Sequence, residues 1–482
     1  MKIGLVHPNC DSVHKKQRQA YGPLERPPET GLAVLSSWIK EYSVNDHEIT
    51  VFNPNKSIKE LARQASQCDL LGMTNWFANH GYCIEISRLA KQINPELKVV
   101  FGGPNASMIP KEIFHNNSHV DYVVNRDGED ALLSIADEKP LSLVPNLWFK
   151  DSYNNPRFTF QSYTDLSKMP LWNYSNFEDV EKRFSEYLHV QKTGLDPWLT
   201  PPLTLFSFRG CLKAIREGIC SYCTSSEATG RMLSAQKFWD QIMHLNNNYD
   251  AEIFYMADDI FPVSPIRINT LANAKPHEAR AKIRAYAYLP YLSKLADSQL
   301  TRMAHDLQKI GVFNLFFGAE NYDENILKNI NKTGISVEET ARIMKLFYKE
   351  GGIKSTVAFM LGLPGESKQT MEYNKNVLKR LLESGCFERL YISIAAPFKG
   401  SFWCKSLESD KKFLADYETA TGKNLQFDDA PDYGLLSRLS IKHKTSTNPE
   451  ELINYFESMI DMALQYMPEY RVGGFLTDFG VN

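Results

Sequence analysis

Segments of strand character alternate with segments of helical character along most of this chain, and this alternation limits the fold more than any other feature. In the first part of the chain, short apolar runs are each followed by an amphipathic helical pattern. The predicted strands are Lys2–Val6, His47–Phe52, Leu70–Thr74, Lys98–Phe101 and Val120–Val124. This βαβα order predicts an α/β domain at residues 1–150, in which helices cover both faces of a Rossmann-like, doubly wound parallel sheet.

A second series of alternating segments begins at Leu203. Helical patterns such as Ser336–Lys349 separate its strands. Six such units predict a partial (β/α)6 barrel at residues 201–404, shorter than the eight units of a closed TIM-type barrel. We expect residues 151–200 to connect the two domains and residues 405–482 to be mostly helical. The predicted strands are Leu203–Phe208, Glu252–Met256, Lys282–Tyr288, Phe313–Gly318, Ser355–Met360 and Arg389–Ala395.

The composition is that of a globular protein with several domains. The chain has 482 residues, of which 43% are hydrophobic, and a formal net charge of −3. This charge favours neither nucleic acid nor an anionic membrane as a partner. The first residues are predicted to form a strand and not a signal peptide, and no apolar run is long enough to span a membrane. With eight cysteines and no export signal, we expect a cytoplasmic location.

Three cysteines follow the first strand of the second series, with the spacing C-x8-C-x2-C at Cys211, Cys220 and Cys223. Three thiolates on one loop can bind three irons of a [4Fe–4S] cluster and leave the fourth iron open to a small molecule. No fourth cysteine lies close in sequence, as an electron-transfer cluster would require. The spacing alone also allows a zinc site completed by a distant histidine, or ordinary core packing of free cysteines.

Further segments lie where predicted strands end in both series. Together with the cysteine loop they resemble the motifs of the cobalamin-dependent (B12-binding domain) radical S-adenosylmethionine (SAM) enzymes, over roughly residues 1–400. The family loop usually has three residues between its first two cysteines, whereas this loop has eight. The segments are Pro27–Leu32, Gly72–Trp76, Gly102–Asn105, Asp127–Ala131, Tyr255–Phe261, Arg284–Tyr286, Phe317–Asn321, Asn331–Gly334 and Phe359–Glu366.

The resemblance implies roles for side chains of the barrel. Cys211, Cys220 and Cys223 would bind the cluster. Glu320 would contact the ribose or ammonium of SAM, with a structural ion pair as the alternative. The adjacent Asp258 and Asp259 would bind the SAM ammonium or a polar group of the substrate, with a helix N-cap as the alternative. The other implied SAM contacts are Tyr222, Arg284, Tyr286, Gly318, Met360, Gly362 and Pro364.

The resemblance also implies a corrin site in the first domain. None of the eleven histidines lies in a D-x-H-x-x-G motif, so we expect no histidine ligand below the cobalt. Trp76 would cap the lower face of the corrin, with an ordinary core tryptophan as the alternative. The implied cobalamin contacts are Thr74, Asn75, Trp76, Gly102, Gly103, Pro104, Gly128 and Glu129.

The implied cofactors are a [4Fe–4S] cluster, SAM and cobalamin. The implied reaction cleaves SAM to a 5′-deoxyadenosyl radical and transfers a methyl group through cobalamin to an unactivated carbon. The alternatives are a radical enzyme that deoxygenates, rearranges or cyclises without methylation, and a non-catalytic iron–sulfur protein. The expected partners are a small-molecule or peptide substrate and a flavodoxin- or ferredoxin-type reductant.

Overall fold

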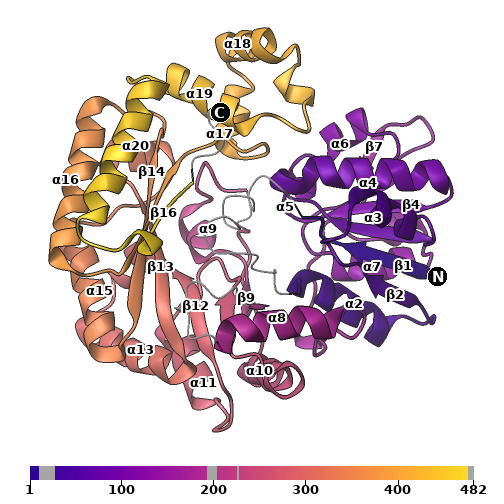
Figure 1. The fold of residues 1–482 in the computed structure, drawn as a ribbon, viewed down its shortest axis with the longest axis horizontal. Coiled ribbons are helices and arrows are strands. Elements are labelled where there is room, and N and C mark those ends of the chain that lie inside the picture. Colours follow the sequence, from indigo (N-terminus) through magenta and orange to yellow (C-terminus); the bar gives the residue numbers. More distant parts are fainter. Residues whose placement is uncertain (10–27, 193–202, 225–226, 476–482) are drawn as a thin grey trace. The chain divides into compact units, whose positions relative to one another are not determined.

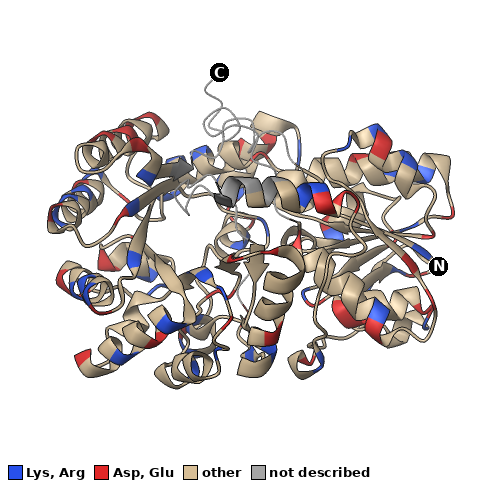
Figure 2. Cartoon of the chain, turned by 60° about the horizontal axis from the view of Figure 1, so that its bottom comes forward, with Lys and Arg blue, Asp and Glu red and all other residues tan. Residues whose placement is uncertain are grey.

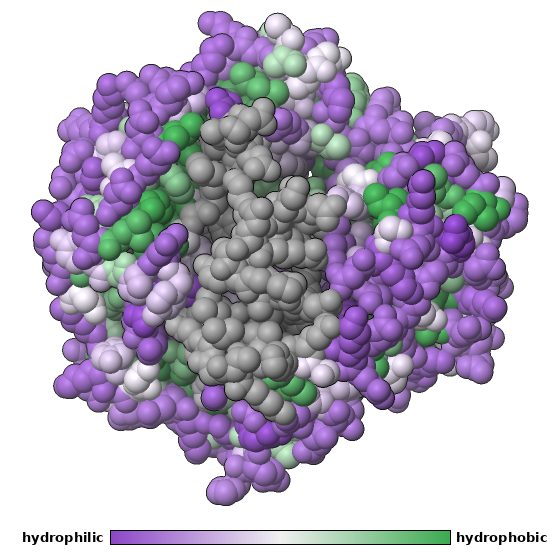
Figure 3. Space-filling view, in the orientation of Figure 1, coloured by the Kyte–Doolittle hydropathy of each residue, from purple (hydrophilic) through white to green (hydrophobic). Residues whose placement is uncertain are grey.

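A computed structural model describes residues 1–9, 28–192, 203–224 and 227–475. The chain forms two compact units (Figure 1). The first comprises residues 1–204, 240–253 and 426–430, and the second comprises residues 205–239, 254–425 and 431–482. Each unit is built around one seven-stranded sheet. Figure 2 marks the charged residues along the ribbon, many of them on the helices, and the described part of the face in Figure 3 is largely hydrophilic.

The sheet of the first unit has the strand order β2-β1-β3-β4-β5-β6-β7. Its five parallel strands are β1 (Lys2–Val6), β2 (Glu48–Val51), β3 (Leu70–Thr74), β4 (Lys98–Gly102) and β5 (Tyr122–Val124). The antiparallel strands β6 (Leu147–Lys150) and β7 (Pro156–Phe158) extend one edge.

Helices cover both faces of this sheet. On one face α3 (Ile58–Ala65) packs beside α4 (His80–Ile93), and on the other α2 (Thr30–Tyr42) packs beside α7 (Glu129–Ala136) (Figure 1). The strand cores are apolar because both faces are covered, as parallel sheets require. In β3, for example, Leu70 and Leu71 are fully buried. The predicted doubly wound α/β fold is therefore confirmed.

The sheet of the second unit has the strand order β16-β15-β14-β13-β12-β11-β8. Six of these strands were predicted; the seventh, β16 (Val472–Phe475), falls in the region that we expected to be mostly helical. Parallel neighbours run from β12 to β16. The other strands are β8 (Leu203–Leu205), β11 (Ile253–Met256), β12 (Lys282–Ala287), β13 (Val312–Glu320), β14 (Lys354–Leu361) and β15 (Arg389–Ile394).

Exposure alternates along the central strands of this sheet. In β14, Val357 and Phe359 are buried, whereas Ala358 and Met360 are only partly buried. The fully buried side chains lie under the helices that connect the strands, such as α15 (Val337–Gly351) and α16 (Lys368–Ser384). A sheet with one packed face and one partly open face is the arrangement of a partial barrel with a lumen.

Among the described residues, no helix is both long and apolar enough to cross a membrane.

Candidate functional site

The three cysteines lie just after the first strand of the barrel sheet. After β8 the chain forms the short strand β9 (Phe208–Arg209) and turns at Gly210. Cys211 is the N-cap residue of α9 (Leu212–Glu217), and Cys220 and Cys223 follow that helix. The backbone N–H of Cys223 donates to the carbonyl of Cys220 at 3.0 Å, so a tight turn joins these two residues.

Gly210 allows the turn that leads into the cysteine loop. Its φ is +112°, in the region that favours glycine. A Cβ atom at this position would lie 1.5 Å from the carbonyl oxygen of Thr229. The backbone N–H of Cys211 also donates to the carbonyl of Glu227 at 2.9 Å. The start of the cysteine loop therefore lies against residues 227–229, which follow the loop in sequence.

The segment that follows β13 fastens the cysteine loop. Lys213 Nζ donates to the carbonyls of Gly218 and Asn331, and the side-chain amide of Asn331 donates to the carbonyl of Ile219 at 2.8 Å. The N–H of Ser221 donates to the carbonyl of Ile330 at 2.9 Å. The eight residues between the first two cysteines therefore form a helix and a turn that are held in place.

The thiol of Cys220 lies in a partly buried, basic environment. Burial raises its pKa, and the ammonium groups of Lys332 and Lys213 act in the opposite direction. Metal binding displaces the thiol proton, and nearby cations favour the thiolate. In the described part of the chain, no three His, Cys, Asp or Glu side chains are arranged around one metal ion. Three thiols on a single loop instead fit a cluster, in which each thiolate binds a different iron.

Glu320 lies beside the cysteine loop. Its Oε1 accepts a hydrogen bond from Lys332 Nζ at 2.7 Å and one from the hydroxyl of Tyr222 at 3.1 Å. Glu320 ends β13, where the register with β14 shifts, and its φ is +60°. An irregularity at a strand end redirects a side chain, and the strained backbone persists where surrounding contacts hold it. The structure thus forms the ion pair that we considered for Glu320, and the same carboxylate contacts Tyr222, the residue before Cys223.

The two carboxylates after β11 differ in their surroundings. Asp258 is fully buried, and its carboxylate accepts hydrogen bonds from the backbone N–H and the hydroxyl of Ser207, both at 2.7 Å. Burial raises the pKa of Asp258 to about 7. Asp259 is partly exposed. Neither is a helix N-cap, since the next helix, α11 (Pro265–Asn273), is capped by Ser264.

Arg284 and Tyr286 lie on β12, where Arg284 is buried and Tyr286 is 36% exposed. The ring of Tyr286 contacts those of Tyr255 and Phe316 edge to face, at 5.5 and 5.0 Å between centroids. Phe316 contacts Tyr391 in turn, at 5.6 Å. Aromatic rings from four strands therefore line the partly open face of the barrel sheet.

The turn after β14 is closed by a carboxylate. Gly362, with a φ of +81°, donates its N–H to Glu366 Oε2 at 2.5 Å, and Asn321 Nδ2 donates to Glu366 Oε1 at 3.2 Å. Glu366 is fully buried, and burial raises its pKa to about 7. Gly318 and Met360 are partly buried on β13 and β14, and Pro364 lies within the turn.

In the first unit, the predicted cobalamin residues gather at the carboxyl ends of β3 and β4. The N–H of Asn75 donates to the carbonyl of Gly102 at 2.7 Å. Gly103 has a φ of +95°, and a Cβ there would approach the backbone of Asn75 to 3.0 Å. Thr74 ends β3, and Pro104 begins α5 (Pro104–Met108).

Two aromatic side chains are exposed beside these loops, Trp76 by 46% and Phe77 by 44%. Trp76 lies near His7, with 6.0 Å between their ring centroids. A Cβ added to Gly102 would meet only open space. An exposed apolar platform beside open backbone fits the broad face of a corrin.

Gly128 and Glu129 lie at the start of α7. Glu129 is buried and accepts a hydrogen bond from the hydroxyl of Thr164 at 3.1 Å. This contact joins α7 to the segment after β7, so Glu129 has a packing role in the first unit.

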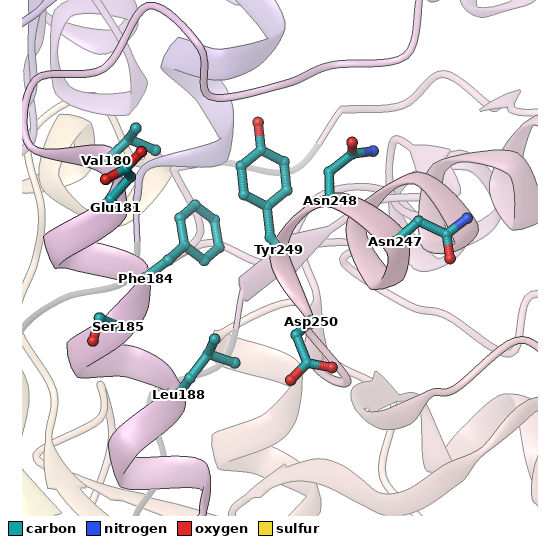
Figure 4. A pocket seen from close by; sticks show the side chains of 9 residues that line it. All are labelled: Val180, Glu181, Phe184, Ser185, Leu188, Asn247, Asn248, Tyr249 and Asp250. Carbon is teal, nitrogen blue, oxygen red and sulfur yellow. The ribbon is translucent and has the colours of Figure 1, made fainter.

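A separate groove of about 750 Å³ lies in the first unit (Figure 4). Phe184 of α8 (Val180–Lys192) and Tyr249 of α10 (Ala235–Tyr249) stack at 4.4 Å between centroids along it. Glu181 and Asp250 add acidic groups to its lining. It contains none of the predicted site residues.

Comparison with protein families assigns both units. Residues 26–136 match the model of the B12 binding domain, and residues 206–378 match that of the Radical SAM superfamily. The chain therefore combines the two domains of a cobalamin-dependent radical SAM enzyme, as the motifs predicted.

Two curated proteins are similar in sequence. An uncharacterized methyltransferase of Pyrococcus horikoshii is 22% identical over 417 residues, which covers 83% of this chain and 82% of that protein. A 2-(S-pantetheinyl)-carbapenam-3-carboxylate methyltransferase of Streptantibioticus cattleyicolor is 20% identical over 70% of this chain and 48% of its own length.

Two solved structures share the fold. The radical SAM methyltransferase TsrM of Kitasatospora setae, with cobalamin and a [4Fe–4S] cluster bound, superimposes with a TM-score of 0.69 at 15% identity and covers 98% of this chain and 90% of its own. The cobalamin-dependent radical SAM enzyme OxsB, with aqua-cobalamin and SAM bound, gives a TM-score of 0.63 at 16% identity and covers 100% and 63%.

Proposed function

We propose that this protein is a cobalamin-dependent radical SAM methyltransferase that methylates an unactivated carbon of a small molecule. The observation that carries the proposal is the combination, in one chain, of a B12-binding domain with a radical SAM domain that begins at the three-cysteine loop. Both curated relatives are named as methyltransferases, which favours methyl transfer over the other radical outcomes.

Each cofactor has a candidate site among the residues of this chain. Cys211, Cys220 and Cys223 hold the [4Fe–4S] cluster, and Glu320 with Tyr222 holds SAM. The loops after β3 and β4, together with Trp76, would hold cobalamin. When bound, these groups supply hydrogen-atom abstraction from carbon and delivery of a methyl group.

The residues of the chain orient these groups. Lys332 fixes the position of the Glu320 carboxylate, and the hydroxyl of Tyr222 donates to the same oxygen. Burial raises the pKa of Tyr222 well above its usual value, so this hydroxyl stays a hydrogen-bond donor at neutral pH. Such pre-positioned groups lower the entropic cost of reaction. The reductant is a flavodoxin- or ferredoxin-type protein.

The first test is cluster binding. Protein purified without air and reconstituted should bind about four irons. Replacement of Cys211, Cys220 and Cys223 by alanine should abolish this iron and its charge-transfer absorption. Cys386→Ala is the matched control, because Cys386 is buried in the core of the same unit. A full cluster in the triple variant would refute the assignment.

The second test is the fate of SAM during turnover. Methyl transfer that also uses a radical step consumes SAM in two ways, so S-adenosylhomocysteine and 5′-deoxyadenosine should accumulate in similar amounts. Chromatography of both nucleosides against time measures this. Abundant 5′-deoxyadenosine without S-adenosylhomocysteine would refute methyl transfer and favour a deoxygenation or rearrangement.

A further inference from the structure

A short segment from late in the sequence belongs structurally to the first unit. Residues 426–430 lie between α18 (Lys411–Thr421) and α19 (Tyr433–Lys444) in sequence, but they cluster with the first unit. The ring of Phe427 stacks on His115 at 5.1 Å between centroids. The carbonyl of Phe427 accepts a hydrogen bond from Asn116 Nδ2 at 2.7 Å. These contacts fasten the segment to α6 (Pro110–Asn116).

The carboxylate of Asp429 accepts three hydrogen bonds from side chains of the first unit. Its Oδ2 accepts hydrogen bonds from His80 Nε2 at 3.0 Å and from Asn117 Nδ2 at 2.6 Å, and its Oδ1 accepts one from Asn116 Nδ2 at 2.8 Å. The side chains of His80 and Asp429 are only 3% and 11% exposed. Burial alone would raise the pKa of Asp429, but the hydrogen bond and charge of His80 and the bond from Asn117 outweigh it and lower the pKa. Asp429 is therefore ionised at neutral pH.

His80 transmits this contact to the loops at the carboxyl edge of the sheet. Its Nε2–H faces the carboxylate of Asp429, and its Nδ1 faces the side-chain amide of Asn75. Asn75 Nδ2 lies 3.0 Å from that Nδ1, and Asn75 Oδ1 accepts a hydrogen bond from Asn105 Nδ2 at 2.8 Å. Asn75 follows β3, and Asn105 lies in the first turn of α5, which follows β4. A continuous chain of hydrogen bonds therefore runs from Asp429 to the two loops to which we assign cobalamin.

We propose that Asp429 is a positioning residue of the B12 site. It fixes the orientation of the His80 ring, which fixes the amides of Asn75 and Asn105 and hence the loops that receive the corrin. Partners that orient the groups of a binding site contribute to affinity although they do not touch the ligand. Asp429 lies 349 residues from His80 in sequence, so the cobalamin site of the first unit depends on a segment of the C-terminal region. The inference rests on the proposed binding of cobalamin.

The test is a titration of the full chain with hydroxocobalamin, followed by absorption. Asp429→Asn keeps the shape of the side chain but removes its charge, and it should weaken binding about tenfold. Asp429→Glu restores the charge and should recover part of the affinity. The matched control is Asp416→Asn, because Asp416 also pairs with a histidine, His443, at 2.9 Å, but within the second unit. This control should bind cobalamin as the wild type does.

Asn116→Ala is the second variant, in case Asp429→Asn fails to fold. Asn116 is exposed and holds both Phe427 and Asp429, so its loss loosens the segment without removing any group of the hydrogen-bond chain. It should weaken cobalamin binding severalfold. In a double variant with His80→Asn, the effect of Asp429→Asn should largely disappear, because both substitutions act through the same contact.

Hydrogen exchange without cofactor separates this inference from the proposed function. Backbone amides of residues 75–80 and 102–105 should exchange faster in Asp429→Asn than in the wild type, and equally in Asp416→Asn. Failure of the wild type to bind cobalamin would refute the proposed function, and with it this role of Asp429. Binding by the wild type with equal affinity and equal exchange in Asp429→Asn would refute the inference alone.

Discussion

Glu320 shows how one side chain of the site is shaped by neighbours that are distant in sequence. It ends β13 in a left-handed backbone conformation and receives hydrogen bonds from Lys332 and Tyr222. The sequence pattern predicted its position at the end of a strand. Lys332 lies in the motif segment Asn331–Gly334, but its contact with Glu320 was not predictable, because the two are twelve positions apart in sequence and a helix lies between them.

Replacement of Glu320 by glutamine should destabilise the fold as well as weaken SAM binding. Lys332 and Glu320 are only 9% and 11% exposed, so the substitution leaves a buried ammonium without its carboxylate. The expected loss is about 3 kcal/mol in the free energy of unfolding, measured with urea. Adding Lys332→Met to the same chain removes the unpaired charge and should recover most of it. Unchanged stability of Glu320→Gln would contradict the ion pair.

Asp258 predicts a pH dependence of stability. Its pKa is raised from 3.8 to about 7 in the folded protein, mainly by burial. Folding therefore favours the protonated form, and this contribution is fully present below about pH 4 and is lost as the pH rises through 7. Asp258→Asn imitates the protonated form and keeps a partner for Ser207. At pH 8 it should be more stable than the wild type, by on the order of 2 kcal/mol.

Urea unfolding of the apoprotein at pH 5 and pH 8 measures this difference. Asp259→Asn is the matched control, since the neighbouring Asp259 is partly exposed. Because this variant keeps Asp258, its stability should fall between the two pH values as much as that of the wild type. A wild-type stability that rises from pH 5 to pH 8 relative to Asp258→Asn would contradict the sign of the prediction.

At the scale of elements, hydrophobic pattern and length were sufficient for the regular strands and helices. The predicted bounds of β1 and β3 coincide with the structure, because these segments combine a clear period with defined ends. Strands β6, β7 and β16 were missed. They are short and lie at or near sheet edges, where pairing with a neighbour and not local sequence decides that a strand forms.

The cysteine loop is the element whose conformation depends most on a single glycine. Gly210→Ala would place a methyl group against the carbonyl of Thr229 and force a positive φ on alanine. The loop must then move, so we expect iron incorporation to fall by at least half after reconstitution. Gly385→Ala is the matched control, because Gly385 also has a positive φ of 61° but no atom within 4 Å of the new Cβ. Normal iron content in Gly210→Ala would show that the loop tolerates the change.

At the scale of the whole molecule, the fold type of the two domains was predictable, but the full set of segments that forms each unit was not. Alternating patterns indicated where each sheet begins, since each series of strands is continuous in sequence. The first unit, however, also includes residues 240–253 and 426–430. No local pattern marks such segments, because their assignment depends on long-range contacts such as that between Asp429 and His80.

A fragment of residues 1–204 should therefore be less stable than the first unit within the full chain. In the full chain, Gln241 exchanges two hydrogen bonds of 3.0 Å with the backbone of the buried Trp172, and the hydroxyl of Tyr249 accepts one of 2.9 Å from the N–H of Tyr174. The fragment loses these partners and exposes the aromatic rings beneath them. Buried polar groups left without partners cost about 1–3 kcal/mol each.

Urea unfolding, followed by tryptophan fluorescence, compares the fragment with the full chain. The intact protein with Gln241→Ala is the intermediate case, because it removes only the contacts to Trp172. Its free energy of unfolding should fall by about 2 kcal/mol, and that of the fragment by more. A fragment as stable as the first unit of the intact chain would show that residues 1–204 fold independently. Residues 240–253 and 426–430 would then contribute little to the stability of the first unit.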